Sequence, residues 1–255
     1  MARYLLAVVV HSADMLRTRL RPEFSVDVFV IDIGGTSVKF WHTAHEEHRK
    51  FPSGKRLTPE VMVKEAMDLV HDWQWETIAL GLPCRVSNGR VVEDPQNLGP
   101  GWIGFNFAAA FGKPVRIMND AALQALGSYD DGRMLFLGLG TAVGSAYIAD
   151  HLVLSLDLGR MKFGDETLYK LLGDEGFEEL GAKKWQAVVQ EVVPAIKTAM
   201  MADYVVLGGG SVKHIETLPE SVRRGHNRTV VEGGRKLWEE LPDPAEKHSG
   251  VWLIL

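Results

Sequence analysis

Short apolar runs recur through the first half of the chain and predict buried strands. They lie at residues 26–33, 37–42, 77–83 and 114–118. Between the second and the third run, residues 58–73 predict a helix with Thr58 as its cap and Pro59 in its first turn. The predicted buried stripe of this helix is Val63, Met67, Val70 and Trp73. Asn88-Gly89, flanked by alternating residues, predicts a tight hairpin.

The second half repeats the theme of strands that end in glycines. Residues 133–155 read as strand, glycine loop, strand, turn and strand, and residues 204–212 as a strand that runs into glycines. A long helix is predicted over 183–202, with a kink at Pro194. A last helix is predicted over 229–241, where Gly233-Gly234 is unfavourable unless close packing compensates for it.

A partial internal repeat suggests how the chain is divided. The segments "VFVIDIGGTSVKF" and "LFLGLGTAVGSAYI" both read as strand, glycine turn, strand, and they open the two halves. We therefore expect two lobes with flanking extensions. The expected parts are an N-terminal appendage at 1–25, a small N-terminal lobe at 26–118, a large C-terminal lobe at 119–241 and a tail at 242–255.

Composition narrows the classes of function. The chain has 255 residues, of which 46% are hydrophobic, and a net charge of −5, so it lacks the basic surplus that nucleic-acid binding requires. The single cysteine, Cys84, excludes an intrachain disulfide and a cysteine-cluster zinc site, and favours a cytoplasmic location. The apolar run at 4–10 is too short to span a bilayer, so no membrane partner is expected.

The glycine turns are candidates for phosphate binding, because their backbone N–H groups can converge on an anion. In the first turn, Thr36 adds a hydroxyl, and Asp32 can hold Mg²⁺ or its waters but not phosphate itself. A plain hairpin is the alternative for one turn alone, but two such turns plus "LGGGS" at 207–211 favour a clamp on a phosphate-bearing ligand. A dinucleotide loop is disfavoured because a strand, not a helix, follows "GLGTAVG".

Two polar segments lie between the glycine elements. Asn119-Asp120 follows a strand and precedes a helix, so Asp120 can act as a general base toward a sugar hydroxyl, or the pair can simply cap the helix. The loop "EDPQNLGPGWIGFN" offers Asn97 to a polyhydroxylated ligand, and its alternative interpretation is a surface loop anchored by a buried Trp102.

Taken in order, the motifs D-I-G-G-T, G-L-P, N-L-x-x-x-W, N-D-A-A, G-L-G-T-A-V-G and L-G-G-G resemble those of the ROK family of sugar kinases. The resemblance covers residues 26–241 and is closest to the polyphosphate glucokinase branch. It implies an α/β, actin-like and hexokinase-like (ribonuclease H-like) two-lobe ATPase fold with a central cleft. It also implies transfer of a phosphoryl group from ATP or polyphosphate, with Mg²⁺, to a hexose, typically the 6-hydroxyl of glucose.

The resemblance also implies roles for single residues. Asp120 would be the catalytic base, with Asn119 and Asn97 holding the sugar and Asp32 reaching the metal indirectly. The phosphate and nucleotide positions would be Asp32, Gly34, Gly35 and Thr36, then Gly140, Thr141 and Gly144, and finally Gly208, Gly209 and Gly210, which would face adenosine or polyphosphate.

One motif departs from the family. Where the family usually has E-x-G-H in contact with the sugar, this chain has Asp157 and Arg160. Either the two side chains pair with each other, which would remove both from sugar binding, or Arg160 receives an anionic group of the substrate. Glu166 is the expected further sugar ligand. With one cysteine, the family's zinc motif cannot form, so no structural zinc is expected.

Two rival functions and one assembly question stay open from the sequence. The altered motif allows a catalytically inactive sugar or nucleotide sensor with the same fold. An actin-like or chaperone-like ATPase is the other rival, although 255 residues leave little room for its partner surfaces. Homodimers are common in the family, and a small-molecule sugar is the expected partner.

Overall fold

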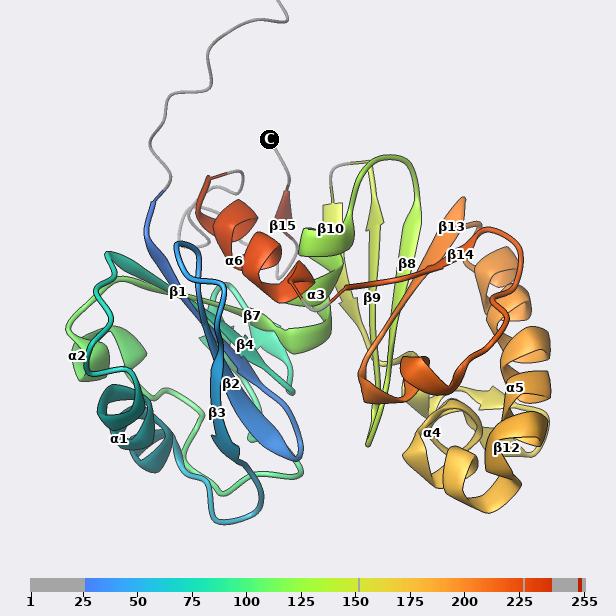
Figure 1. Ribbon diagram of the computed structural model, residues 1–255, viewed down its shortest axis with the longest axis horizontal. Helices are drawn as coiled ribbons and strands as arrows, with labels where there is room; N and C mark the ends of the chain where they lie inside the picture. The colour runs from blue at the N-terminus through green and yellow to red at the C-terminus, as the bar shows by residue number, and fades with distance from the viewer. Residues whose placement is uncertain (1–25, 151, 227, 240–251, 254–255) are drawn as a thin grey trace, which may run out of the picture.

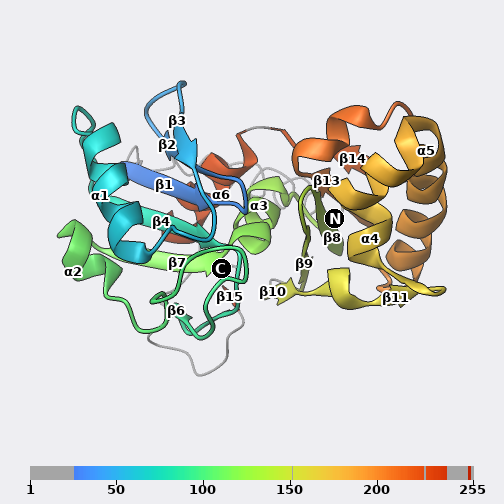
Figure 2. The same cartoon turned by 90° about the horizontal axis from the view of Figure 1, so that it is seen from below.

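The computed structural model describes residues 26–150, 152–226, 228–239 and 252–253. The predicted appendage at 1–25 and most of the predicted tail at 242–255 lie outside these residues. The described chain forms two separate mixed sheets, with two helices between them (Figures 1 and 2). The exact division into lobes stays a prediction.

The first sheet has the strand order β3-β2-β1-β4-β7. Its strands are β1 (Val28–Ile33), β2 (Ser37–His42), β3 (Arg49–Pro52), β4 (Thr77–Leu82) and β7 (Val115–Asn119). The central strand β1 is buried along its whole length, pairs antiparallel with β2 through the first glycine turn, and pairs parallel with β4. The predicted strands of the first half are therefore confirmed.

Two helices cover the outer face of this sheet, α1 (Pro59–Leu69) and α2 (Phe107–Phe111) (Figure 1). Thr58 caps α1 as predicted, because its hydroxyl accepts a hydrogen bond from the Val61 N–H. The predicted place of Met67 in the buried stripe is wrong, since its exposed fraction is 40%. The stripe instead passes through Met62 and Ala66, which are fully buried.

The second sheet has the order β14-β13-β8-β9-β10-β15. Its strands are β8 (Met134–Leu139), β9 (Val143–Ala149), β10 (Leu152–Leu156), β13 (Tyr204–Gly208), β14 (Val222–Arg224) and β15 (Trp252–Leu253). A short helix, α4 (Leu168–Leu172), and a long one, α5 (Asp174–Ala199), pack on its outer side. The long helix α5 begins earlier than predicted, and its backbone leaves helical geometry at Gly181. The kink at Pro194 stays a prediction.

The helices between the sheets are α3 (Asp120–Ser128) and α6 (Thr229–Glu239). They cross so closely that a Cβ added to Gly127 would lie 1.7 Å from the Thr229 carbonyl oxygen. A Cβ added to Gly233 would lie 2.0 Å from the Leu123 carbonyl oxygen. The close packing predicted for the glycine pair of the last helix is confirmed, and α6 also packs against β1 and β4.

Two small hairpins complete the described fold. The first joins β5 (Val86–Ser87) to β6 (Arg90–Val91), with both Asn88 and Gly89 at positive φ, as the sequence predicts. The second joins β11 (Lys162–Phe163) to β12 (Glu166–Thr167). Within the described ranges, no helix combines the length and the hydropathy needed to cross a bilayer.

His42 makes the stability of the first sheet depend on pH. The ring is buried and neutral, since its Nδ1 accepts a hydrogen bond from the Ala44 N–H (3.0 Å) and its Nε2 donates to the Gln74 carbonyl (2.7 Å). Burial lowers the pKa of His42 below its ordinary 6.5. The unfolded chain therefore binds this proton first, and the free energy of unfolding decreases as the pH falls below about 6.5.

We expect urea unfolding between pH 7.5 and pH 5 to show this loss of stability. The loss should be smaller in His42→Gln, whose amide can donate to Gln74 but does not titrate. His71→Gln, at an exposed histidine of the same lobe, is the matched control and should keep the wild-type pH dependence. An unchanged pH dependence in His42→Gln would contradict the assignment.

Candidate active site

Two carboxylates converge where the first sheet meets α3. Asp32 lies near the end of β1 with 7% of its surface exposed, and Asp120 is the first residue of α3, directly after β7. The positions of the two carboxylates follow from the sheet topology, because the carboxyl ends of the parallel strands β1, β4 and β7 lie at one edge of the sheet. The charge of Asp32 acts on Asp120, so the predicted base and the predicted metal residue are brought together.

The environment of this pair is suited to proton transfer. Burial, reinforced by the charge of Asp32, raises the pKa of Asp120 to about 7. Burial also raises the pKa of Asp32, while the charge of Lys39 and a hydrogen bond from the Gln124 side chain act in the opposite direction. A carboxylate with a pKa near neutrality can both accept a proton and release it at physiological pH.

Asn119 is the cap of α3. Its Oδ1 accepts a hydrogen bond from the Ala122 N–H (3.2 Å), and its Nδ2 donates to the carbonyls of Leu82 and Cys84 (3.4 and 3.3 Å). The helix-cap interpretation therefore holds for Asn119, whose role as a sugar ligand stays a prediction. The cap fixes the first turn of α3 to the end of β4 and thereby positions Asp120.

The first glycine turn lies beside the predicted sugar residue Asn97. The Gly34 N–H donates to the Ser37 carbonyl (2.9 Å), which closes the turn between β1 and β2. A Cβ added to Gly35 would lie 3.7 Å from Asn97 Nδ2. The loop that carries Asn97 is anchored by Trp102, which is fully buried and donates to the Gly99 carbonyl (2.8 Å). One loop thus contains both the buried Trp102, which anchors it, and Asn97, which lies near the first glycine turn.

The second and third glycine elements are joined by Asp174, a residue that the sequence analysis missed. Asp174 accepts hydrogen bonds from the hydroxyls of Thr141 (3.2 Å) and Ser211, and its N–H donates to the Gly140 carbonyl (2.9 Å). Gly209 has φ +87°, and an added Cβ would lie 2.1 Å from the Leu139 carbonyl oxygen. An acidic residue at a helix start is a sequence signal, but the predicted helix began too late to reveal it.

Gln124 is the second residue that the sequence analysis missed. It lies one helical turn after Asp120, hydrogen-bonds to Asp32, and its Oε1 lies 3.4 Å from a Cβ added to Gly208. On the second sheet, a Cβ added to Gly144 would lie 3.0 Å from the Ala121 Cβ. The start of α3 is therefore the point at which elements of both sheets meet.

In the segment that departs from the family motif E-x-G-H, Asp157 and Arg160 pair with each other. Arg160 Nε donates to Asp157 Oδ2 (2.6 Å), and the Tyr169 hydroxyl donates to Asp157 Oδ1 (2.6 Å). The hydrogen bond to Asp157 raises the pKa of Arg160, and the charge of Glu93, from the loop after β6, acts in the same direction. Glu166 lies on the β11–β12 hairpin and accepts from Lys170 Nζ (3.4 Å). Its sugar contact stays a prediction.

The carboxylates fit a magnesium ion that is shared with a phosphate ligand. Among the described residues, no group of three or more His, Cys, Asp or Glu side chains is arranged to hold a metal ion. Mg²⁺ is usually bound through one or two carboxylates, several waters and substrate phosphates. Asp32, beside the first glycine turn and Asp120, matches that incomplete type of site.

Comparison with curated proteins gives relatives named polyphosphate glucokinase. No protein-family model matches the chain. The chain is 26% identical over 204 residues to the polyphosphate glucokinase of Mycobacterium tuberculosis. The aligned residues cover 71% of this chain and 77% of the relative. It is 27% identical over 205 residues to the polyphosphate glucokinase of Mycobacterium leprae, with 71% and 63% covered.

Solved structures extend the likeness to the fold. The inorganic polyphosphate/ATP-glucomannokinase of Arthrobacter sp. strain KM superposes with a TM-score of 0.70 at 20% identity, over 82% of this chain and 97% of that one. A ROK family glucokinase from Streptomyces griseus gives a TM-score of 0.63 at 12% identity, over 83% and 98%. The resemblance inferred from the motifs and the predicted actin-like, hexokinase-like two-lobe fold are therefore confirmed.

Proposed function

We propose that this chain, which has the fold of the ROK sugar kinases, transfers a phosphoryl group from ATP or polyphosphate to a hydroxyl of a glucose-like hexose. The observation that carries the proposal is the position of Asp120. Asp120 has a pKa of about 7 and lies within reach of the charge of Asp32. The glycine elements, which we propose bind phosphate, lie around the helix α3 that Asp120 opens. The names of the relatives, polyphosphate glucokinase and polyphosphate/ATP-glucomannokinase, agree with this chemistry.

In the proposed reaction, Asp120 accepts the proton of the sugar hydroxyl, most simply the 6-hydroxyl, as the hydroxyl oxygen attacks the terminal phosphorus of the donor. The bond between that phosphorus and the bridging oxygen breaks, and ADP or the shortened polyphosphate leaves. Asp32 would hold the waters of Mg²⁺, and the bound ion would neutralise charge on the donor phosphates. In the first glycine turn the Gly34 N–H closes the turn, so the backbone N–H groups of Gly35 and Thr36 would face the donor, and Thr36 adds a hydroxyl. Gln124 keeps the Asp32 carboxylate oriented.

The remaining site residues are assigned by proximity and by resemblance. Gly140, Thr141, Gly144 and Gly208 to Gly210 would line the donor on the second sheet, with Asp174 fixing two of the loops. Asn97 and Asn119 would contact the sugar from the first sheet. Because Asp157 and Arg160 pair with each other, we propose that the pair is withdrawn from sugar binding and that Arg160 binds no separate anion.

The sensor alternative is not favoured by the geometry. A protein that only binds sugar has no need of a carboxylate whose pKa is raised to about 7 beside a second buried carboxylate, because an uncharged polar residue would be less costly to bury. Homodimer formation stays a prediction of the family resemblance.

The function is tested with the full chain and a panel of glucose, mannose, amino sugars and acidic sugars, each assayed with ATP and with polyphosphate in the presence of Mg²⁺. We expect sugar-dependent transfer, highest with a neutral hexose. Hydrolysis of ATP without any sugar requirement would instead support an ATPase. Thermal stabilisation by sugar without product would support the sensor.

A further inference from the structure

Lys39 lies on β2 and has been given no role above. In the antiparallel pairing of β1 with β2 it lies directly opposite Asp32, and only the pair of Ile33 and Val38 separates these two residues from the first glycine turn. Residues directly opposite each other on neighbouring strands place their side chains on the same face of the sheet. The Lys39 ammonium and the Asp32 carboxylate therefore share one face, close to the first glycine turn.

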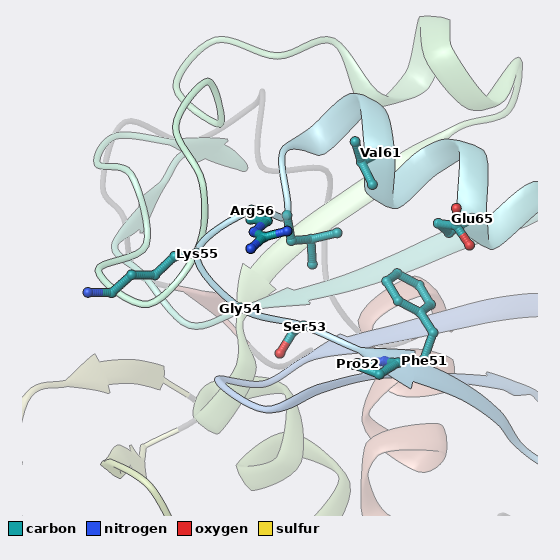
Figure 3. Close-up of a pocket in the computed structure, with 9 residues that line it drawn as sticks. Phe51, Pro52, Ser53, Gly54, Lys55, Arg56, Val61 and Glu65 are labelled. Atoms are coloured by element: carbon teal, nitrogen blue, oxygen red, sulfur yellow. The ribbon is translucent and has the colours of Figure 1, made fainter.

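This face of the first sheet is the one that meets α3 and α6. Val30 and Trp41, each two positions from that pair along its strand, pack in one cluster with residues of both helices. The opposite face lies beside α1, where Phe51, the partner of Val38 on β3, lines an open cavity of about 480 Å³ (Figure 3). Because side chains alternate along a strand, Lys39 lies on the side of the sheet that meets α3, away from that cavity.

Lys50 of β3 lies directly opposite Lys39, on the other side from Asp32. The three residues form one row across β3, β2 and β1, in which Asp32 is buried, Lys39 is half-buried and Lys50 is exposed. Within the described ranges, neither lysine forms a salt bridge. Like charges directly opposite each other repel, so the Lys39 ammonium is favoured on the side of Asp32 rather than on that of Lys50.

The charge of Lys39 acts on Asp32 although the two groups form no salt bridge. Burial raises the pKa of Asp32, and the charge of Lys39 opposes this effect, so it favours the ionised form that can hold the waters of Mg²⁺. An ammonium without a salt-bridge partner, beside a carboxylate suited to a metal ion, is placed for an anion that contacts both cations. A phosphate group is such an anion, because its several oxygens can be shared between a metal ion and a lysine.

We propose that the Lys39 ammonium contacts a non-bridging oxygen of the phosphoryl group while that group is transferred. The inference rests on the proposed function and adds a residue to its mechanism. During transfer, negative charge is spread over the non-bridging oxygens, and a positioned cation stabilises it. Lys39 stays protonated, because the proton of the sugar hydroxyl goes to Asp120, and the bond from phosphorus to the bridging donor oxygen breaks. ATP and polyphosphate present the same terminal group, so Lys39 acts with both donors.

The test begins with Lys39→Met, which removes the ammonium and keeps the length of the side chain. We expect kcat to fall about 10²-fold or more with ATP and with polyphosphate, the range for loss of one charge-stabilising contact, while KM for the sugar stays within about twofold. Lys39→Gln should show the same loss, and Lys39→Arg, which keeps the charge, a smaller one. Lys64→Met is the matched control, since this exposed lysine on α1 pairs with Asp68, and it should keep wild-type rates.

Two further readouts separate a phosphate contact from a role as counter-ion of Asp32. A counter-ion acts through the metal, so recovery of the Lys39→Met kcat at raised Mg²⁺ concentration would overturn the proposal, and we expect the loss to persist. Calorimetric titration with tripolyphosphate, without Mg²⁺ or sugar, does not depend on turnover. We expect Lys39→Met to bind tripolyphosphate about tenfold more weakly than wild type and Lys64→Met do, because a charge-assisted contact is lost.

The outcomes also distinguish this proposal from the proposed function. If wild type is a kinase but Lys39→Met keeps the wild-type kcat, the Lys39 contact is overturned and the kinase stands. If wild type transfers phosphate from neither donor, the proposed function fails, and the titration alone decides whether Lys39 binds phosphate. Equal affinities of wild type and Lys39→Met for tripolyphosphate would then overturn the contact as well.

Discussion

Asp120→Asn is expected to lower kcat by roughly 10²–10⁴-fold, the range that a positioned general base contributes. Asparagine has nearly the same shape and can still accept the Ala121 N–H that Asp120 accepts at 2.9 Å, so the start of α3 should be preserved. It cannot accept the proton of a sugar hydroxyl. Burial and the charge of Asp32 both disfavour the ionised form of Asp120, so the variant should be at least as stable as the wild type.

The measurement is kcat with the best sugar and donor, together with urea unfolding at pH 8. Asp68→Asn is the matched control, because it removes an exposed carboxylate that pairs with Lys64 on α1. This control should keep full activity. Turnover by Asp120→Asn at the wild-type rate would exclude Asp120 as the base, whereas lost activity together with lost stability would point to a structural role.

The parts of the site that the sequence predicts are those encoded by local patterns. The strand that carries Asp32, the turn at Gly34-Gly35 and the strand-to-helix junction at Asp120 are each specified by residues a few positions apart. Local backbone geometry follows from such patterns, so the secondary structure and the order of the motifs could be predicted. The confirmed hairpin at Asn88-Gly89 is of the same kind.

The residues that were missed depend on contacts between distant segments. Gln124 is an ordinary helix former in sequence, and only the folded structure shows that it joins Asp32 to the third glycine element. Asp174 opens α5, but the glycines at 173, 176 and 181 lower the local helix propensity. The helix is indeed interrupted at Gly181, so the first part of α5 depends on tertiary packing, and the acidic start at Asp174 is its local signal.

The pairing of Asp157 with Arg160 depends on both a local pattern and a contact with a distant segment. The sequence places the two residues three positions apart, which allows a pair but does not require one. A 3₁₀ turn at Leu158–Arg160 brings them together, and Tyr169 fixes Asp157 from another element. A Cβ added to Gly159 would lie 2.3 Å from the Tyr169 ring, so the contact also requires glycine at that position.

Gly233→Ala is expected to destabilise the protein by about 1–3 kcal/mol, although alanine is the better helix former by about 1 kcal/mol. Packing decides the sign, because the added Cβ would lie 2.0 Å from the Leu123 carbonyl oxygen and 3.2 Å from the Gly127 N. A real Cβ cannot occupy that position, so α6 must move away from α3. Urea unfolding measures the loss, with Gly225→Ala as the control, since its Cβ would meet nothing closer than 3.5 Å.

The same substitution should also affect catalysis in the molecules that remain folded. α3 carries Asp120 and Gln124, and its position relative to β1 is fixed on one side by α6, which packs against both α3 and β1. When α6 is displaced, α3 loses its support, and the distance between Asp120 and the first glycine turn is no longer fixed. We therefore expect a kcat reduced at least severalfold at temperatures well below the unfolding midpoint, because small misplacements of a base slow proton transfer strongly. A variant as stable and as active as the wild type would show that the crossing of α3 and α6 is looser than the structure indicates.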